Sequence, residues 1–212
     1  MRLAINLTFC AEAASETIKK DGNKKEKKKV EKYISRLRDI VNGKNSKCPN
    51  TLSNMIKIAE EFGKNGKSVI NIYSHLEEFS FENQESLLHI LDEMFQIESE
   101  PNPLSSTIGT NSENAKEWDT DTLIDKFSKE SKSSSYAHLM KSLTTQPETH
   151  ELFLNFEVLN KLIENIESGD AHISKNSNEV LEAILVSSTH QDIVSKFIGE
   201  NYEEVIKVIN KL

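Results

Sequence analysis

Apolar side chains recur at intervals of three and four residues through most of this 212-residue chain. That interval places them on one face of an α-helix, whereas a half-buried strand would alternate apolar and polar positions. With only seven glycines and four prolines, the pattern predicts an all-α fold rather than a sandwich or barrel. The predicted helices lie at 3–18, 30–41, 52–62, 69–79, 87–95, 120–130, 133–145, 148–154, 156–168, 175–188, 190–199 and 201–212.

The helix near 52–62 has recognisable start and stop signals. Pro49 precedes it, with Asn50 or Thr51 as the expected cap, and Gly63 and Gly66 are expected to close it. Its apolar face is predicted to bury Leu52, Met55, Ile56, Ala59 and Phe62.

Residues 98–116 interrupt the helical pattern. They contain Pro101, Pro103 and Gly109 among many Ser, Asn and Glu residues, a composition typical of loops. We therefore expect a flexible acidic and Ser-rich loop here, between an N-terminal helical lobe at 1–97 and C-terminal helical repeats of the same solenoid at 117–212. Because a loop of this length is uncommon inside a compact domain, the segment is either an insertion between repeats or a linker between two small lobes.

The last third of the chain repeats its apolar pattern. Apolar positions at 156–163 recur 46 residues later at 202–209, and those at 123–127 recur 39 residues later at 162–166. Periods of about 40–47 residues are typical of armadillo and HEAT repeats, whose stacked copies bury one continuous core. An armadillo/HEAT-like helical-repeat solenoid is therefore predicted, with an ordinary helical bundle as the alternative. The predicted core residues are Phe156, Leu159, Leu162, Leu185, Phe197, Tyr202, Val205 and Ile209.

Charge is distributed unevenly along the chain. Residues 1–47 contain 13 Lys or Arg and 6 Asp or Glu, a net charge of +7, whereas residues 48–212 have a net charge of −15. The acidic body argues against nucleic-acid binding and allows a protein partner with a basic surface. The lysine-rich stretch at 24–29 is either a site for a phosphate-rich surface or a solvated helix face.

Cysteine content and hydropathy bear on the location of the protein. Cys10 and Cys48 are too few for a disulfide framework or a metal-binding quartet, so a reducing, cytoplasmic location is predicted. No apolar run has the length of a membrane span. The apolar start of the chain matches a signal peptide poorly because Asn6 and Thr8 interrupt it.

The sequence contains no recognisable catalytic motif. Its six histidines form no His-Glu-x-x-His zinc site, and no glycine-rich phosphate loop or Gly-x-Ser-x-Gly turn occurs. Asp119 and Asp121 begin a pattern like a calcium loop, but the glycine and the closing glutamate of such a loop are missing. We therefore predict no enzymatic activity, no cofactor and no metal site.

Three stretches of the chain resemble the Mo-twenty-five family of kinase scaffolds, also called the calcium-binding protein thirty-nine family. The stretches are Val30 to Phe95, above all Arg38 to Gly43 and Leu76 to Glu82; Glu117-Trp118 with the helix ending at Glu130-Ser131; and His190, Val194, Phe197-Ile198, Asn201-Tyr202 and Val205. The resemblance implies an armadillo-like solenoid and a non-catalytic scaffold that holds a sterile-twenty-type kinase or a pseudokinase on its concave face.

The resemblance also implies a difference at the C-terminus. Family members continue with several more helices, which form most of the pocket for a partner's Trp-Glu-Phe tail. The chain is therefore expected to be a natural short member or a truncated one, and no tail-binding residue is assigned.

The predicted function is a non-catalytic scaffold for a protein kinase or pseudokinase. Exposed polar positions of the helix at 175–188, namely Asn178, Glu179 and Glu182, are predicted to form part of the concave surface, unless they only keep that face solvated. The alternative function is a generic helical-repeat adaptor with an unrelated protein or membrane-associated partner, which the basic N-terminal region motivates.

Overall fold

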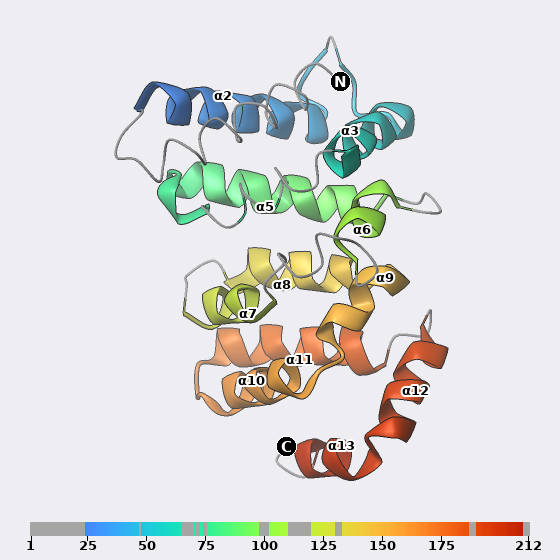
Figure 1. Cartoon of the computed structure of the whole chain (residues 1–212). Coiled ribbons are helices and arrows are strands. Elements are labelled where there is room, and N and C mark those ends of the chain that lie inside the picture. Colours follow the sequence, from blue (N-terminus) through green and yellow to red (C-terminus); the bar gives the residue numbers. More distant parts are fainter. Residues whose placement is uncertain are drawn as a thin grey trace.

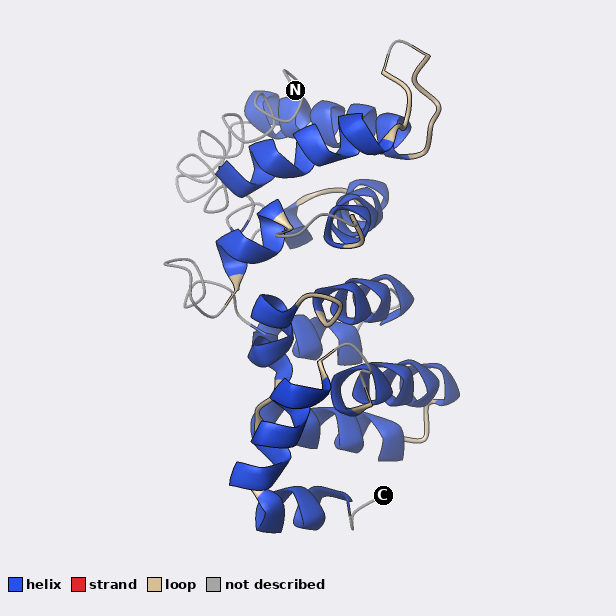
Figure 2. Ribbon diagram, turned by 90° about the vertical axis from the view of Figure 1, so that its right-hand side faces the viewer, coloured by secondary structure: helices blue, strands red, loops and turns tan. Residues whose placement is uncertain are grey.

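The computed structural model describes residues 24–46, 48–64, 70, 73, 76–97, 102–109, 120–129, 133–186 and 190–209. These residues form helices joined by short turns, and no strand occurs among them (Figure 2). The all-α prediction is therefore confirmed, while the predicted helix at 3–18 lies outside the described residues. The α-helices are α2 (Lys24–Val41), α3 (Leu52–Lys64), α5 (Phe81–Phe95), α6 (Pro103–Ile108), α7 (Thr120–Lys129), α8 (Ser133–Leu143), α9 (Pro147–His150), α10 (Phe156–Glu167), α11 (Ala171–Leu185), α12 (Gln191–Glu200) and α13 (Tyr202–Ile209). Two 3-10 turns, η1 (Leu76–Glu78) and η2 (Glu151–Phe153), connect them.

The described α-helices other than α12 lie in three rows. The first row is α2, α5, α8 and α11, each packed on the next, and Figure 1 shows them one above another. The second row contains α3, α6 and α9, and the third contains α7, α10 and α13. One helix from each row makes a repeat, and successive repeats stack along one axis into a helical-repeat solenoid.

The repeat found in the sequence corresponds to the third row. α10 begins at Phe156 and α13 begins at Tyr202, the two positions that the 46-residue offset relates. The 39-residue offset relates α7 to α10. Both offsets thus join helices that occupy the same place in successive repeats.

One cluster of buried apolar side chains runs through the described repeats, from Val30 in α2 to Ile184 in α11. In α2, for example, Val30, Ile34 and Leu37 are all 0% exposed. Burying one such side chain contributes roughly 1.5–3 kcal/mol. The short helices are therefore stabilised by packing on neighbouring helices more than by intrinsic propensity.

Residues 102–109 correct the expectation of a flexible loop at 98–116. They form α6, which buries Leu104 and Ile108. Asn102 caps the helix, because its side-chain oxygen accepts hydrogen bonds from the backbone N–H groups of Leu104 and Ser105 at 3.0 and 3.2 Å. Asn and Pro are common in loops, but Asn followed by Pro is also a favoured helix start. The rest of 98–116 lies outside the described residues.

One prediction about α3 is wrong, and another is tested only in part. α3 ends at Lys64, so Gly63 lies in its last turn, and Gly66 lies outside the described residues. A Cβ atom on Gly63 would lie only 2.6 Å from the carbonyl oxygen of Pro103, so the absence of a side chain lets α6 pack closely on α3. Leu52 is 59% exposed because it is the first residue of α3 and extends beyond the helix-packing contacts, whereas Ile58 is buried.

The predicted core position at Tyr202 is also wrong. Tyr202 is 63% exposed, whereas Val205 is 3% exposed. Tyr202 is the first residue of α13 and lies at the exposed start of the helix, whereas Val205 lies about one turn further along. Of the other predicted core residues, Leu159 and Leu162 are buried, Phe156, Leu185 and Phe197 pack half-buried against the core, and the side chain of Ile209 is outside the described part.

Candidate functional site

The first row of helices presents a continuous polar surface, which we call the ladder face. It is the outward side of α5, α8 and α11. Along the centre of this side lie residues seven positions apart, which is about two helical turns. These central residues are Glu82, His89 and Gln96 on α5, His138 and Thr145 on or just after α8, and Lys175 and Glu182 on α11; all are exposed except His89, which is half-buried.

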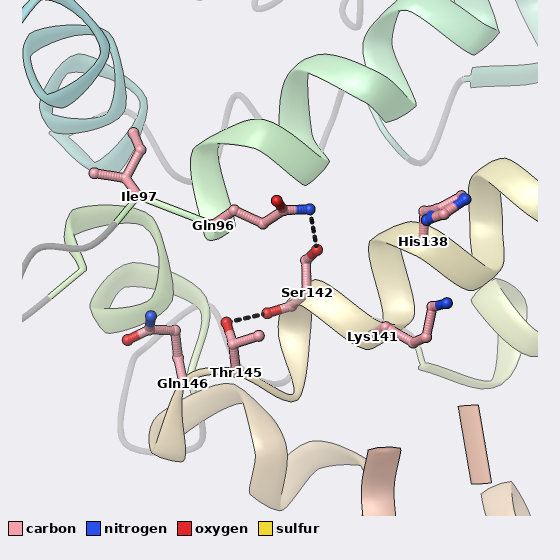
Figure 3. A pocket seen from close by; sticks show the side chains of 7 residues that line it. All are labelled: Gln96, Ile97, His138, Lys141, Ser142, Thr145 and Gln146. Atoms are coloured by element: carbon pink, nitrogen blue, oxygen red, sulfur yellow. Dashed lines mark hydrogen bonds between the residues drawn. The ribbon is translucent and has the colours of Figure 1, made fainter. Parts of the chain in front are cut away.

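Hydrogen bonds join α5 to α8 at the edge of the ladder face. The Ser135 hydroxyl donates to Glu85 Oε2 at 2.7 Å. Further along, the Ser142 hydroxyl donates to the carboxylate of Asp92, and Gln96 Nε2 donates to Ser142 Oγ at 3.0 Å (Figure 3). Asp92 and Ser142 are both buried, so these polar groups fix the position of α8 on α5.

The junction of α8 with α11 is also polar. Lys141 Nζ lies 2.7 Å from Glu179 Oε2, and Ser134 Oγ lies 3.1 Å from His172 Nε2. The hydrogen bond and the charge of Lys141 hold the pKa of the Glu179 carboxyl below its ordinary value. Ser134 and Lys141 lie about 100–120° around α8 from Ser135, so one helix bonds to both neighbours.

Polar contacts also join α5 to α2. Arg38 Nη1 donates to Glu82 Oε1 at 2.7 Å and to Ser86 Oγ at 3.1 Å. His89 Nε2 lies 3.1 Å from Asn42 Oδ1. Each step of the first row therefore has its own polar contacts at the rim of the ladder face, in addition to the apolar core behind it.

An open hollow lies in the ladder face where α5 and α8 end. It has a volume of about 550 Å³, and its lining residues are Gln96, Ile97, His138, Lys141, Ser142, Thr145 and Gln146 (Figure 3). A second hollow of about 300 Å³ adjoins it, since Gln96 and Ile97 line both. The second hollow extends to the exposed Leu52 at the start of α3. Together they offer apolar and polar groups to a side chain from a partner.

The three residues predicted for partner binding lie within about one turn of α11, but their surroundings differ. Glu179 is engaged in the ion pair with Lys141. Glu182 is exposed on the ladder face, in line with Lys175 about two turns earlier on the helix. Asn178 is exposed as well, but it lies about 100° around the helix from Glu179, on the side away from α8.

A pair of histidines behind the hollow was not singled out by the sequence. His150 at the end of α9 is fully buried, and its Nε2 donates to the backbone oxygen of Ile184 in α11 at 2.8 Å. His190 before α12 lies with its ring 5.4 Å away, and its Nε2 contacts the backbone oxygen of Thr145 at 3.0 Å. The two residues are 40 positions apart in the sequence, so no local motif relates them.

The hydrogen bond to Ile184 indicates which nitrogen of the buried His150 ring carries a proton. A backbone oxygen only accepts hydrogen bonds, so Nε2 of His150 carries the proton. Its Nδ1 is buried and has no hydrogen-bond partner. Burial lowers the pKa of His150 and outweighs the hydrogen bond to the Ile184 oxygen, which raises it; the nearby His190 also lowers it and Glu151 raises it. This pair therefore has a structural role at the junction of α9, α11 and α12.

The described residues contain no group of three His, Cys, Asp or Glu side chains that would hold a metal ion. The calcium-like pattern at Asp119 and Asp121 falls on side chains outside the described part. Within that part, no helix combines the length and apolar character needed to cross a lipid bilayer.

Two comparisons with known proteins bear on the identity of the chain. No curated protein matches the chain. A family profile described as Mo25-like matches residues 3–212. The proteins of this family are non-catalytic scaffolds built as armadillo-like helical repeats, which confirms the predicted fold class and the prediction that the chain is not an enzyme. The three rows of helices thus form the scaffold of a protein that belongs to the Mo25-like family.

Proposed function

We propose that the chain is a scaffold that binds a sterile-twenty-type protein kinase or a pseudokinase through the ladder face. The observation that carries this proposal is the continuity of the ladder face over three successive repeats, with an open hollow where α5 and α8 end. Membership of a family of scaffolds supports it at the level of the protein class.

The ladder face suits a protein partner because its side chains are already held in place. Gln96 is fixed by Ser142, and Lys141 is fixed by Glu179. A surface whose side chains are ordered before binding loses less conformational entropy when a partner docks. The face also contains both signs of charge, at Lys175 and Glu182, which would fix the orientation of a partner.

The hollow is the expected anchor point. Residues that contribute most to protein–protein affinity are large side chains that fill pockets near the centre of an interface. Here His138 is exposed on one wall, while Ile97 is buried in another. A large partner side chain would therefore bury its apolar part against Ile97 and keep its polar groups near the rim.

A binding assay with a purified sterile-twenty-type kinase or pseudokinase domain tests this proposal. His138→Trp would fill the hollow and should weaken binding by about tenfold or more, since an obstructed anchor removes the strongest contacts of an interface. Glu164→Trp is the matched control, because Glu164 is exposed on α10, in the third row. The control should bind like the unchanged chain, and circular dichroism should show both variants folded.

A second pair of variants tests the predicted residues of α11. Asn178→Lys with Glu182→Lys raises the net charge by three and should weaken binding. Glu164→Lys with Glu167→Gln raises it equally on α10 and should not. If both pairs and both Trp variants bind like the unchanged chain, the ladder face is not the binding site. If no kinase or pseudokinase domain binds the unchanged chain, the kinase assignment is wrong.

A further inference from the structure

α2 carries a line of exposed basic side chains on the side away from the core. Lys28, Lys32 and Arg36 are all exposed and are four residues apart, so they lie along one side of the helix over about 12 Å. The line ends at Asp39, one turn further on. We call these three residues the basic stripe.

Two other charged residues of α2 face α5 rather than the side of the basic stripe. Glu31 Oε1 accepts a hydrogen bond from the backbone N–H of Ser80 at 3.2 Å, and Arg38 is paired with Glu82. Both residues therefore face α5. Overall α2 contains eight Lys or Arg and three Asp or Glu, so the stripe belongs to a strongly basic helix in an acidic protein.

We infer that the basic stripe docks the chain on the anionic headgroups of a lipid membrane. Anionic lipids such as phosphatidylserine attract basic residues that lie close to the membrane surface, with about a fivefold gain in affinity for each residue. The inference does not depend on the proposed kinase binding, because α2 lies outside the ladder face.

The contact would be electrostatic and confined to the headgroup layer. A helix that inserts into a membrane needs an apolar face free to enter the acyl region. In α2 that face is used by the protein core, since Val30, Ile34 and Leu37 are fully buried. Binding should therefore depend strongly on salt, because the Debye length falls from about 10 Å at 0.1 M salt to about 3 Å at 1 M.

A membrane fits the stripe better than an acidic protein does. Lysine is a hydrated point charge that needs no fixed partner geometry, which suits a fluid layer of headgroups. Protein interfaces instead centre on large anchors such as Trp, Tyr and Arg in packed pockets. The stripe is two-thirds lysine, and no large apolar side chain is exposed on the described part of α2.

The position of α2 in the solenoid is also suitable. α2 lies at one end of the described solenoid, and the acidic first turn of α13, with Glu203 and Glu204, lies at the opposite end (Figure 1). Several layers of helices, each about 8–10 Å apart, separate the two ends. That separation exceeds the physiological Debye length of about 8 Å, so the acidic end would not repel a membrane that touches α2.

Vesicle co-sedimentation tests the inference with the full chain. Vesicles of phosphatidylcholine containing phosphatidylserine should bind the chain, and vesicles of phosphatidylcholine alone should not. Lys28→Gln, Lys32→Gln and Arg36→Gln together should weaken this binding by at least about tenfold. The control replaces Lys57, Lys196 and Lys207 by Gln, which gives the same net charge from exposed positions on α3, α12 and α13. It should bind within about twofold of the unchanged chain.

Several outcomes would overturn the inference. They are failure of the unchanged chain to bind phosphatidylserine vesicles, equal binding to both kinds of vesicle, and equal weakening in the stripe variant and the control. Binding to soluble polyglutamate without binding to vesicles would overturn it as well and would assign the stripe to an acidic protein partner. Thermal melting of each variant separates loss of binding from loss of folding.

Discussion

Lys141 and Glu179 approach to 2.7 Å across the junction of α8 and α11. Glu179 also lies 3.9 Å from Lys175 on its own helix, so two cations flank its carboxylate. The hydrogen bond from Lys141 has the larger effect on the pKa of Glu179, which is lowered. A residue predicted to contact a partner is thus already used to join two repeats.

Removal of the Lys141 ammonium group should change the pKa of the Glu179 carboxyl. Lys141→Met should raise the pKa of Glu179 toward its ordinary value of 4.5, as measured by NMR titration of the side-chain carboxyl. Because the folded-state pKa is the lower one, the pair contributes stability above pH 4.5, and this contribution is lost as the pH falls through the lowered pKa. An unchanged pKa in the variant would show that the ion pair does not persist in solution.

His150 should make the fold sensitive to mild acid. Its folded-state pKa is lowered from 6.5, so the unfolded chain binds the proton more readily. Stability is therefore complete above pH 6.5 and decreases as the pH falls below it. Thermal melts should show a melting temperature a few degrees lower at about pH 5.5 than at about pH 7.5.

The His150 prediction has a direct control. His150→Gln keeps an N–H donor for the oxygen of Ile184 but does not titrate. It should melt lower than the unchanged chain at neutral pH and should show a smaller decrease on acidification. An equal acid sensitivity in both proteins would assign the effect to other groups.

Asn102 should be among the most sensitive polar residues of the fold. It is 1% exposed, and its side-chain amide donates to the backbone oxygen of Met94 at 3.0 Å while its oxygen caps α6. Asn102→Ala leaves these buried backbone groups without partners and should lower the free energy of unfolding by about 2–3 kcal/mol. Urea denaturation measures the loss. Asn54→Ala, at an exposed hydrogen bond to Pro49, should cost much less.

Two glycines should respond in opposite ways to the same substitution. Gly63→Ala places a Cβ atom 2.6 Å from the Pro103 oxygen and should destabilise the protein by about 1–3 kcal/mol. Gly199 lies in α12, and a Cβ atom added there would have no neighbour within 4 Å, so Gly199→Ala should stabilise the protein by up to about 1 kcal/mol. Thermal or urea unfolding distinguishes the two. Equal effects would mean that α6 does not pack on α3 as described.

Two residues of α13 test whether burial or aromatic character decides how much a side chain contributes to stability. Val205→Ala should lower the free energy of unfolding by about 1–2 kcal/mol, because its side chain is nearly fully buried. Tyr202→Ala should change it by less than about 0.5 kcal/mol, since its side chain is mostly exposed. A larger loss at Tyr202 would indicate that the tyrosine is covered in solution.

The helices were predictable because the apolar side chains that a helix buries recur every three or four residues along the sequence. The predicted segment at 156–168 corresponds to Phe156–Glu167, since Leu159 and Leu162 define one face. α6 was not predictable in this way, because six residues are too few to show a helical period and its start depends on the cap at Asn102.

Contacts between repeats were less accessible to sequence reasoning. Lys141 and Glu179 are 38 residues apart, and no local pattern relates them. The same holds for His150 and His190. The polar side chains of the ladder face were therefore predictable as exposed positions on α11, but the ion pair and the hollow depend on how the repeats stack.

The polar contacts that join α2 to α5, α5 to α8 and α8 to α11 have a mechanical consequence. Each junction has its own contacts, such as Ser142 with Asp92, and each described helix of the row packs mainly on its immediate neighbours. The curvature of the described solenoid therefore depends on the angle at each of these junctions. A change at the Ser142 junction would rotate α8, together with α11 and α13, relative to α5, so a small local shift would become a larger displacement at α13.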